Sequence, residues 1–101
     1  MFAIEDFENL EWESPAPGCR QKVFHREGKP WRLVEFAPEF VEREWCQKGH
    51  NGIVLSGEFE IDFGDRAVHY PEGSRFYIPA GTPHKARHIA SLVRLFLIDE
   101  V

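Results

Sequence analysis

The sequence predicts an all-β protein, a small antiparallel β-barrel, and three observations lead to this fold class. Short strand-like segments alternate with Gly/Pro turn signals along most of the chain, as in antiparallel sandwiches and barrels. No segment of about ten residues has the apolar spacing of an amphipathic helix. The chain has 101 residues, of which 43% are hydrophobic, and this is enough for one globular core.

The elements follow from where the turn signals fall. Residues 1–18 are expected to form an N-terminal arm and a linker, because the run Ser14-Pro-Ala-Pro-Gly18 favours turns. A single barrel domain is expected over residues 19–101. Its strands are predicted at residues 20–25, 31–36, 40–46, 53–56, 58–63, 67–70, 74–78 and 92–99.

The last of these strands has an unusual pattern. Between Leu92 and Ile98 it is apolar on both faces except at Arg94. A strand that is apolar on both faces needs cover on each side, either from a second sheet, the N-terminal arm or another subunit. We therefore expect a homodimer.

Composition narrows the functional classes. The net charge of −5 and the scattered basic residues argue against a nucleic-acid partner. No apolar run approaches the ~18 residues that cross a membrane, and the acidic start lacks the basic region of a secretion signal, so we expect a cytoplasmic protein. In that setting Cys19 and Cys46 are expected to be free thiols or ligands rather than a disulfide.

The most informative motif lies between Gly73 and His84. A predicted strand runs into Pro79, which cannot donate to a sheet ladder, and Gly81 can reverse the chain. A histidine follows directly after this turn. The motif therefore places one imidazole, that of His84, on a rigid corner, which suits a metal ligand.

The spacing of Gly73, Pro79, Gly81 and His84 resembles the second motif of the cupin family, and residues 44–57 resemble its first motif. The resemblance covers roughly residues 40–88. It implies a jelly-roll-like double-stranded β-helix that binds a small molecule in its cavity. Cupins host many unrelated chemistries, so the resemblance does not name a substrate.

The resemblance also implies a metal site. His50 takes the position of the third ligand of the first motif, while Glu44 and Cys46 occupy positions where the family usually has histidines. A set of Glu44, Cys46, His50 and His84 could hold a divalent transition metal. Two histidines with a carboxylate suit Fe(II), and a thiolate shifts the preference towards Zn(II), with Mn and Ni also open.

Other interpretations of the first motif remain open. Glu44 and Cys46 share a face if residues 40–46 form a regular strand. A register shift by one residue would instead turn Arg43 and Trp45 inward and leave Glu44 as a surface acid. Cys46 could also be a small buried apolar residue.

Four further residues are candidates for a ligand pocket. Trp45 and Phe76 could form walls of the cavity, Tyr77 could offer a hydroxyl group to a ligand, and His88 falls where the second cupin motif often carries Asn. Core packing is the alternative for the aromatic residues, and a solvated turn is the alternative for His88.

Two functional classes follow. One is a metal-dependent enzyme that acts on a small molecule in the barrel cavity. The other is a non-enzymatic cupin that binds or senses a small molecule with a degenerate or absent metal site. The sequence does not decide between them.

Overall fold

The computed structural model describes residues 7–100, and this part of the chain is built from antiparallel strands without an α-helix. This confirms the predicted all-β fold class. No helix among the described residues is long and apolar enough to cross a membrane. The strands are β1 (Glu13–Ala16), β2 (Cys19–Arg26), β3 (Lys29–Phe36), β4 (Gly49–Ser56), β5 (Phe59–Asp62), β6 (Ala67–Tyr70), β7 (Arg75–Ile78), β8 (Lys85–Ala86) and β9 (Val93–Glu100).

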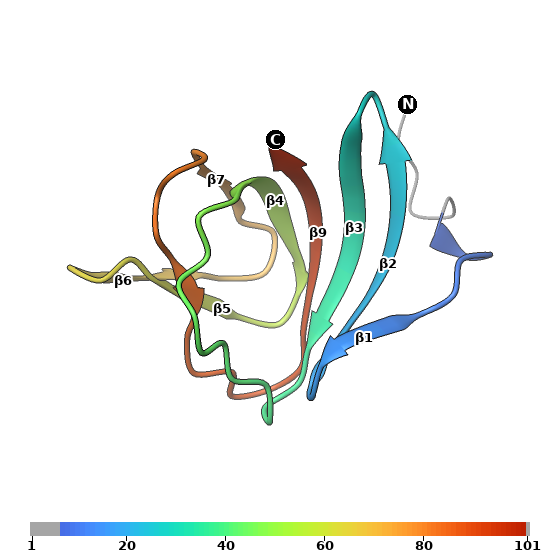
Figure 1. Ribbon diagram of the computed structural model, residues 1–101. Helices are drawn as coiled ribbons and strands as arrows, with labels where there is room; N and C mark the ends of the chain where they lie inside the picture. Colours follow the sequence, from blue (N-terminus) through green and yellow to red (C-terminus); the bar gives the residue numbers. More distant parts are fainter. Residues whose placement is uncertain (1–6, 101) are drawn as a thin grey trace.

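The strands form two sheets that enclose one core. A six-stranded sheet has the order β1-β2-β3-β9-β4-β7, and a three-stranded sheet has the order β6-β5-β8. In Figure 1, β2, β3, β9 and β4 run side by side, and β5 and β6 lie on the other side of the molecule. Phe59 and Ile61 of β5 belong to the same buried cluster as Val34, Val54 and Leu95 of the larger sheet. The two sheets therefore face each other across a shared interior.

The alternation of side chains in β9 shows how the sheet separates inside from outside. Val93, Leu95 and Leu97 are buried in the core, while the alternate residues Phe96 and Ile98 lie on the outer face and are only partly covered. Successive side chains of a strand point to opposite faces of the sheet. The doubly apolar pattern of this strand thus corresponds to a packed inner face and a partly exposed outer face.

Two predicted segments differ from the structure. The strand predicted over residues 40–46 does not form, and only Cys46 makes an isolated bridge, with His84. The backbone of this loop makes hydrogen bonds within the loop and to the turn that carries His84, and among the described residues it is not paired with the backbone of a strand of either sheet. One example within the loop is the bond from Phe40 N–H to Ala37 C=O at 2.9 Å. Within the stretch expected as an arm and linker, Glu13–Ala16 forms β1 and pairs with β2.

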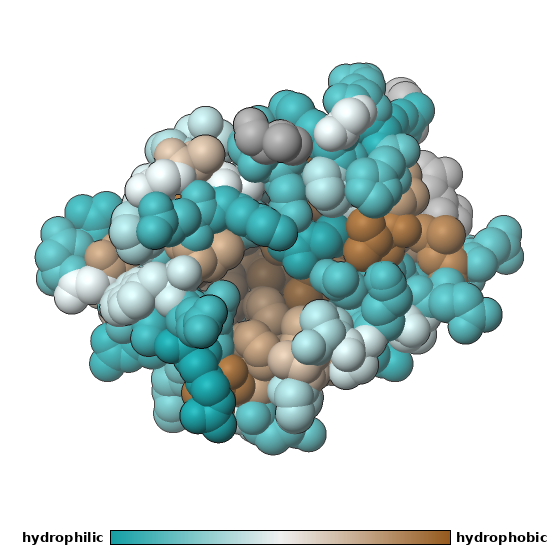
Figure 2. Space-filling model, in the orientation of Figure 1, coloured by the Kyte–Doolittle hydropathy of each residue, from teal (hydrophilic) through white to brown (hydrophobic). Residues whose placement is uncertain are grey.

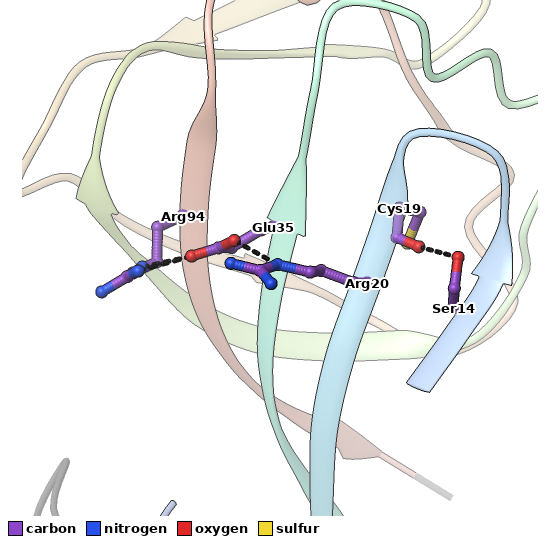
Figure 3. A network of polar contacts seen from close by, with 5 residues as sticks. All are labelled: Ser14, Cys19, Arg20, Glu35 and Arg94. Carbon is purple, nitrogen blue, oxygen red and sulfur yellow. Dashed lines mark hydrogen bonds and ion pairs between the residues drawn. The ribbon is translucent and has the colours of Figure 1, made fainter. Parts of the chain in front are cut away.

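An ionic network around one buried carboxylate lies on the outer face of the six-stranded sheet. Glu35 of β3 lies directly opposite Arg20 of β2 and Arg94 of β9. Both arginines bond its carboxylate, with Nε of Arg20 at 2.7 Å and Nε of Arg94 at 2.9 Å (Figure 3). Burial alone would raise the pKa of Glu35, but the hydrogen bonds from Arg20 and Arg94 outweigh it and lower the pKa. The charged carboxylate therefore holds three adjacent strands together.

We expect Glu35→Gln to lower the free energy of unfolding by about 2 kcal/mol, because it leaves two arginines around a neutral group. The half-exposed arginines keep the loss below that of a fully buried pair. Because the folded-state pKa of Glu35 is lowered, its stabilisation is complete above about pH 4.3 and is lost as the pH falls through the folded value. Urea unfolding at several pH values should show a weaker acid dependence in the variant. Glu58→Gln, on an exposed side chain, is the control, and an equal effect there would contradict this role.

Candidate metal centre

Cys46 reaches the interior because its loop is bonded to the turn that carries His84. The backbone N–H of Cys46 donates to the carbonyl of His84 at 2.8 Å, and the N–H of His84 donates back to the carbonyl of Cys46 at 3.0 Å. The N–H of Gly81 also donates to the carbonyl of Gln47 at 2.8 Å. These bonds connect the two sequence motifs and bring their side chains to the same place.

His50 is oriented from behind by a carboxylate. It lies on β4 directly opposite Asp99 of β9, and its Nδ1–H donates to Asp99 Oδ1 at 2.8 Å. Arg32 donates to the same oxygen from NH2 at 2.9 Å. Burial alone would raise the pKa of Asp99, but the hydrogen bond from His50 and the charge of Arg32 outweigh it and lower the pKa. The ionised carboxylate holds the imidazole with Nε2 turned away from it.

His84 is oriented in the same sense by its own backbone. Its Nδ1–H donates to the carbonyl of Thr82 at 2.8 Å. Nε2, the other ring nitrogen, takes no part in this hydrogen bond. Burial is the main cause that lowers the pKa of His84, and the nearby His50 lowers it further. Both causes favour the neutral imidazole, which is the form that binds a metal.

The three side chains converge on one point. One donor atom from each of Cys46, His50 and His84 can be chosen so that all lie within 4.8 Å of one another. The Cys46 sulfur is 3.9 Å from Nε2 of His50, and the two imidazole rings meet edge to face with centroids 5.1 Å apart. A sulfur and two imidazole nitrogens at this spacing fit the donor preferences of Zn(II) and related ions. A histidine that donates its other N–H to a carboxylate, as His50 does to Asp99, is the usual arrangement of a metal-bound imidazole.

The three side chains line a cavity of about 300 Å³ inside the barrel. Figure 2 shows a hollow whose floor is apolar and whose rim is mostly hydrophilic. Phenylalanines and aliphatic residues from both sheets cover most of the wall, and Glu42, Lys48 and Arg32 add charged groups to it. This size is at the lower end of the range of about 300–1,000 Å³ found for small-molecule sites.

Glu44 does not join the other three predicted ligands. Its side chain is exposed and lies outside the group formed by Cys46, His50 and His84. Because residues 40–46 do not form a regular strand, positions 44 and 46 do not share a face. Glu42 lines the cavity instead, and its Oε1 accepts the N–H of Ala86 at 2.6 Å.

Of the four predicted pocket residues, Phe76 lines the cavity and the other three do not. Tyr77 is 63% exposed, because it follows Phe76 on β7 and alternation turns it to the outer face. Trp45 is 45% exposed and packs beneath Lys85, whose Nζ is 4.4 Å from the ring centroid. His88 is exposed and has a φ of 47° in a loop.

Sequence reasoning missed Arg32, Asp99, Glu42 and Lys48. A signal was present for two of them. Arg32 alternates with Val34 and Phe36, and Asp99 alternates with Leu97 and Leu95, so both share the inner face of their strands. Glu42 and Lys48 lie in the loop before β4, where alternation carries no information.

Comparison with known proteins agrees with the arrangement of the strands. The family model of the cupin domain matches residues 32–98, which is more than half of the chain. The chain belongs to the cupin family. The match includes both motifs that bring His50 and His84 together.

Solved structures with the same fold share little sequence with this cupin. KdgF from a Halomonas species has 19% identity and a TM-score of 0.71, and the match covers 98% of this chain and 93% of that one. The protein NMB1881 from Neisseria meningitidis has 18% identity and a TM-score of 0.68, with 96% and 94% covered. AerE from Microcystis aeruginosa has 19% identity and a TM-score of 0.76, and the match covers 90% of this chain but 45% of AerE. At these identities the likeness shows the fold alone. Comparison with curated protein sequences gives no match.

Proposed function

We propose that this cupin binds a divalent transition metal through the Cys46 thiolate and Nε2 of His50 and His84, and presents it to a small molecule in the cavity. The observation that supports this most is the convergence of the three donor atoms within 4.8 Å. Both imidazoles already donate from Nδ1, to Asp99 and to Thr82. The donor set is therefore oriented for coordination by the protein itself.

The donor set favours zinc. Catalytic zinc sites commonly use three protein ligands and keep one position open for water or substrate. Here the three side chains line the cavity wall, so the open position would face the bound molecule. A metal ion at this place would polarise a substrate oxygen or a bound water molecule. The metal analysis described next distinguishes iron, manganese and nickel from zinc.

Metal analysis tests this proposal directly. The protein should be purified without an affinity tag and its metal content measured by inductively coupled plasma mass spectrometry at neutral pH. We expect about one transition-metal ion per chain, removable by a strong chelator and restored by added zinc. If no metal is retained and none can be added, the non-enzymatic small-molecule-binding cupin becomes the better explanation, because the cavity remains without the ion.

We expect Asp99→Asn to weaken metal binding by about 10–100-fold, because groups that orient a metal-bound histidine typically contribute that much. An amide can still contact the imidazole, but it no longer holds Nδ1 of His50 as the donor with a full negative charge. Metal affinity is measured by competition with a chromophoric chelator. Glu100→Gln is the control. Glu100 is next to Asp99 in the sequence, but its carboxylate pairs with Lys29. Equal affinities of both variants and the unaltered protein would contradict this role for Asp99.

We also propose that the protein is a homodimer through the outer face of the six-stranded sheet. Phe24, Trp31, Phe96 and Ile98 lie there only partly covered, and Phe7 packs over part of the group, 5.1 Å from Phe24 between ring centroids. Burial of such a face in a second copy would remove apolar surface from water. Light scattering at micromolar concentration should give twice the 11.8 kDa chain mass, and a monomer mass would contradict the proposal.

A further inference from the structure

The cavity has a polar end and an apolar end, and the register of the strands defines them. At one end His50 lies opposite Asp99 of β9. Leu97 is the next inward-facing residue of β9, and Arg32 lies opposite it. At the other end Phe36 lies opposite Val93. Phe36 is four positions along the strand from Arg32, which corresponds to about 13 Å.

The apolar end is built from rings. Phe36 stacks on Phe40 with ring centroids 4.5 Å apart and on Phe59 at 5.8 Å. Phe59 in turn contacts Phe76 at 6.0 Å. All four rings line the cavity. The four rings favour an aromatic or branched aliphatic body.

The polar end carries a lysine that has no ion-pair partner among the described residues. Arg32 is neutralised by Asp99 at 2.9 Å, and its NH1 donates to Gln21 at 2.9 Å. Lys48 lines the same cavity between the ligand positions 46 and 50. In the part of the chain that the structure describes, the carboxylates that pair with lysine or arginine are Glu35, Asp99 and Glu100, and Lys48 is in none of these pairs. Glu42, the remaining acid on the wall, accepts the N–H of Ala86 and forms no ion pair with Lys48, although its charge acts on His84 and Cys19.

We infer that the cavity takes a small organic acid, with its acidic group at the polar end beside Lys48 and its apolar body among the four phenylalanines. This inference builds on the proposed function, because it assigns the ligand class of the same cavity. A metal ion held by Cys46, His50 and His84 would add two positive charges at the same end, and the Cys46 thiolate and the Glu42 carboxylate, whose charge acts on His84, would offset part of the total. Lys48 is exposed and its charge is otherwise hydrated, so an acid would gain a contact with it that a neutral molecule lacks, and a cation would be repelled.

Matched pairs of acids and amides test the charge requirement. Phenylacetate and hexanoate are compared with phenylacetamide and hexanamide, which have the same apolar bodies but no charge at neutral pH. Binding is followed at millimolar concentration by shifts of backbone amide signals in nitrogen-15 NMR spectra, with zinc-loaded and metal-free protein. We expect each acid to bind at least about fivefold more tightly than its amide, because a charge-assisted contact is stronger than a neutral one.

Lys48→Met should reduce that preference to less than about twofold. Lys29→Met is the matched control, since it removes the same charge from a side chain that pairs with Glu100 and does not line the cavity. It should keep the full preference for the acids.

Three results would overturn the inference. The amides could bind as tightly as the acids, Lys29→Met could lose the preference as Lys48→Met does, or none of the four probes could shift signals of the cavity residues. Failure of the metal proposal is distinguishable from these. If the protein holds no metal but metal-free protein still prefers the acids through Lys48, the ligand class stands and only the metal proposal fails.

Discussion

His84→Ala is expected to lower zinc affinity by more than about 100-fold, which exceeds the typical effect of removing a group that only orients a metal ligand. The substitution removes one of the three donors that converge within 4.8 Å. His84 is the cleaner test of the site. Among the described residues its side chain has one hydrogen bond, to the nearby Thr82 carbonyl, whereas His50 is part of the network with Asp99 and Arg32. Affinity is measured by chelator competition, and circular dichroism checks that the fold is kept.

The control for this test is His88→Ala, which removes an exposed imidazole from a neighbouring loop and should leave zinc affinity unchanged. His50→Ala should behave like His84→Ala. Cys46→Ser should cost more affinity for zinc than for iron, because a thiolate is the softer ligand. Unchanged zinc affinity in His84→Ala would contradict the proposed metal site, and only the assignment of the fold would stand.

The largest effect on stability is expected from Gly57→Ala, about 4 kcal/mol in the free energy of unfolding. Gly57 joins β4 of the larger sheet to β5 of the smaller one and has a φ of +80°. A Cβ atom there would lie 2.5 Å from the carbonyl oxygen of Leu92 and 3.2 Å from Cα of Val93. Both neighbours are backbone atoms, so the start of β9 would have to move. Urea unfolding measures the change.

Gly28→Ala separates the two causes of that loss. Gly28 has a similar φ of +75° in the turn between β2 and β3, but nothing lies within 4 Å of a Cβ atom there. It should cost only about 1–2 kcal/mol, the cost of a left-handed conformation with a side chain. If Gly57→Ala is no more destabilising than Gly28→Ala, the close approach to Leu92 does not contribute to stability.

Much of the fold could be predicted from the sequence because it depends on local periodicity. The alternation in residues 92–99 and the turn signals around Gly28, Gly64 and Gly73 locate the strands and their inner faces without knowledge of the partners. β2, β3, β4, β5, β6, β7 and β9 all fall on or beside predicted strands. The position of His84 just after the strand ending at Ile78 was also predictable from Pro79 and Gly81.

The loop before β4 could not be predicted in the same way. Its conformation depends on bonds to residues about 40 positions away, from Ala86 N–H to Glu42 and from Lys85 to the carbonyl of Arg43. A strand pattern over residues 40–46 therefore assigned Glu44 to the interior, whereas the loop turns Glu42 there. No local rule distinguishes these two acids.

By itself, the sequence determined an all-β cupin barrel and two motifs that each deliver a histidine. The tertiary structure decided which donors converge, namely Cys46, His50 and His84, and which groups support them. Asp99 reaches His50 across 49 positions of sequence only because β9 pairs with β4. The physical reason is that a side chain's facing follows from local backbone geometry, whereas its partners depend on sheet pairing and on hydrogen bonds between distant segments.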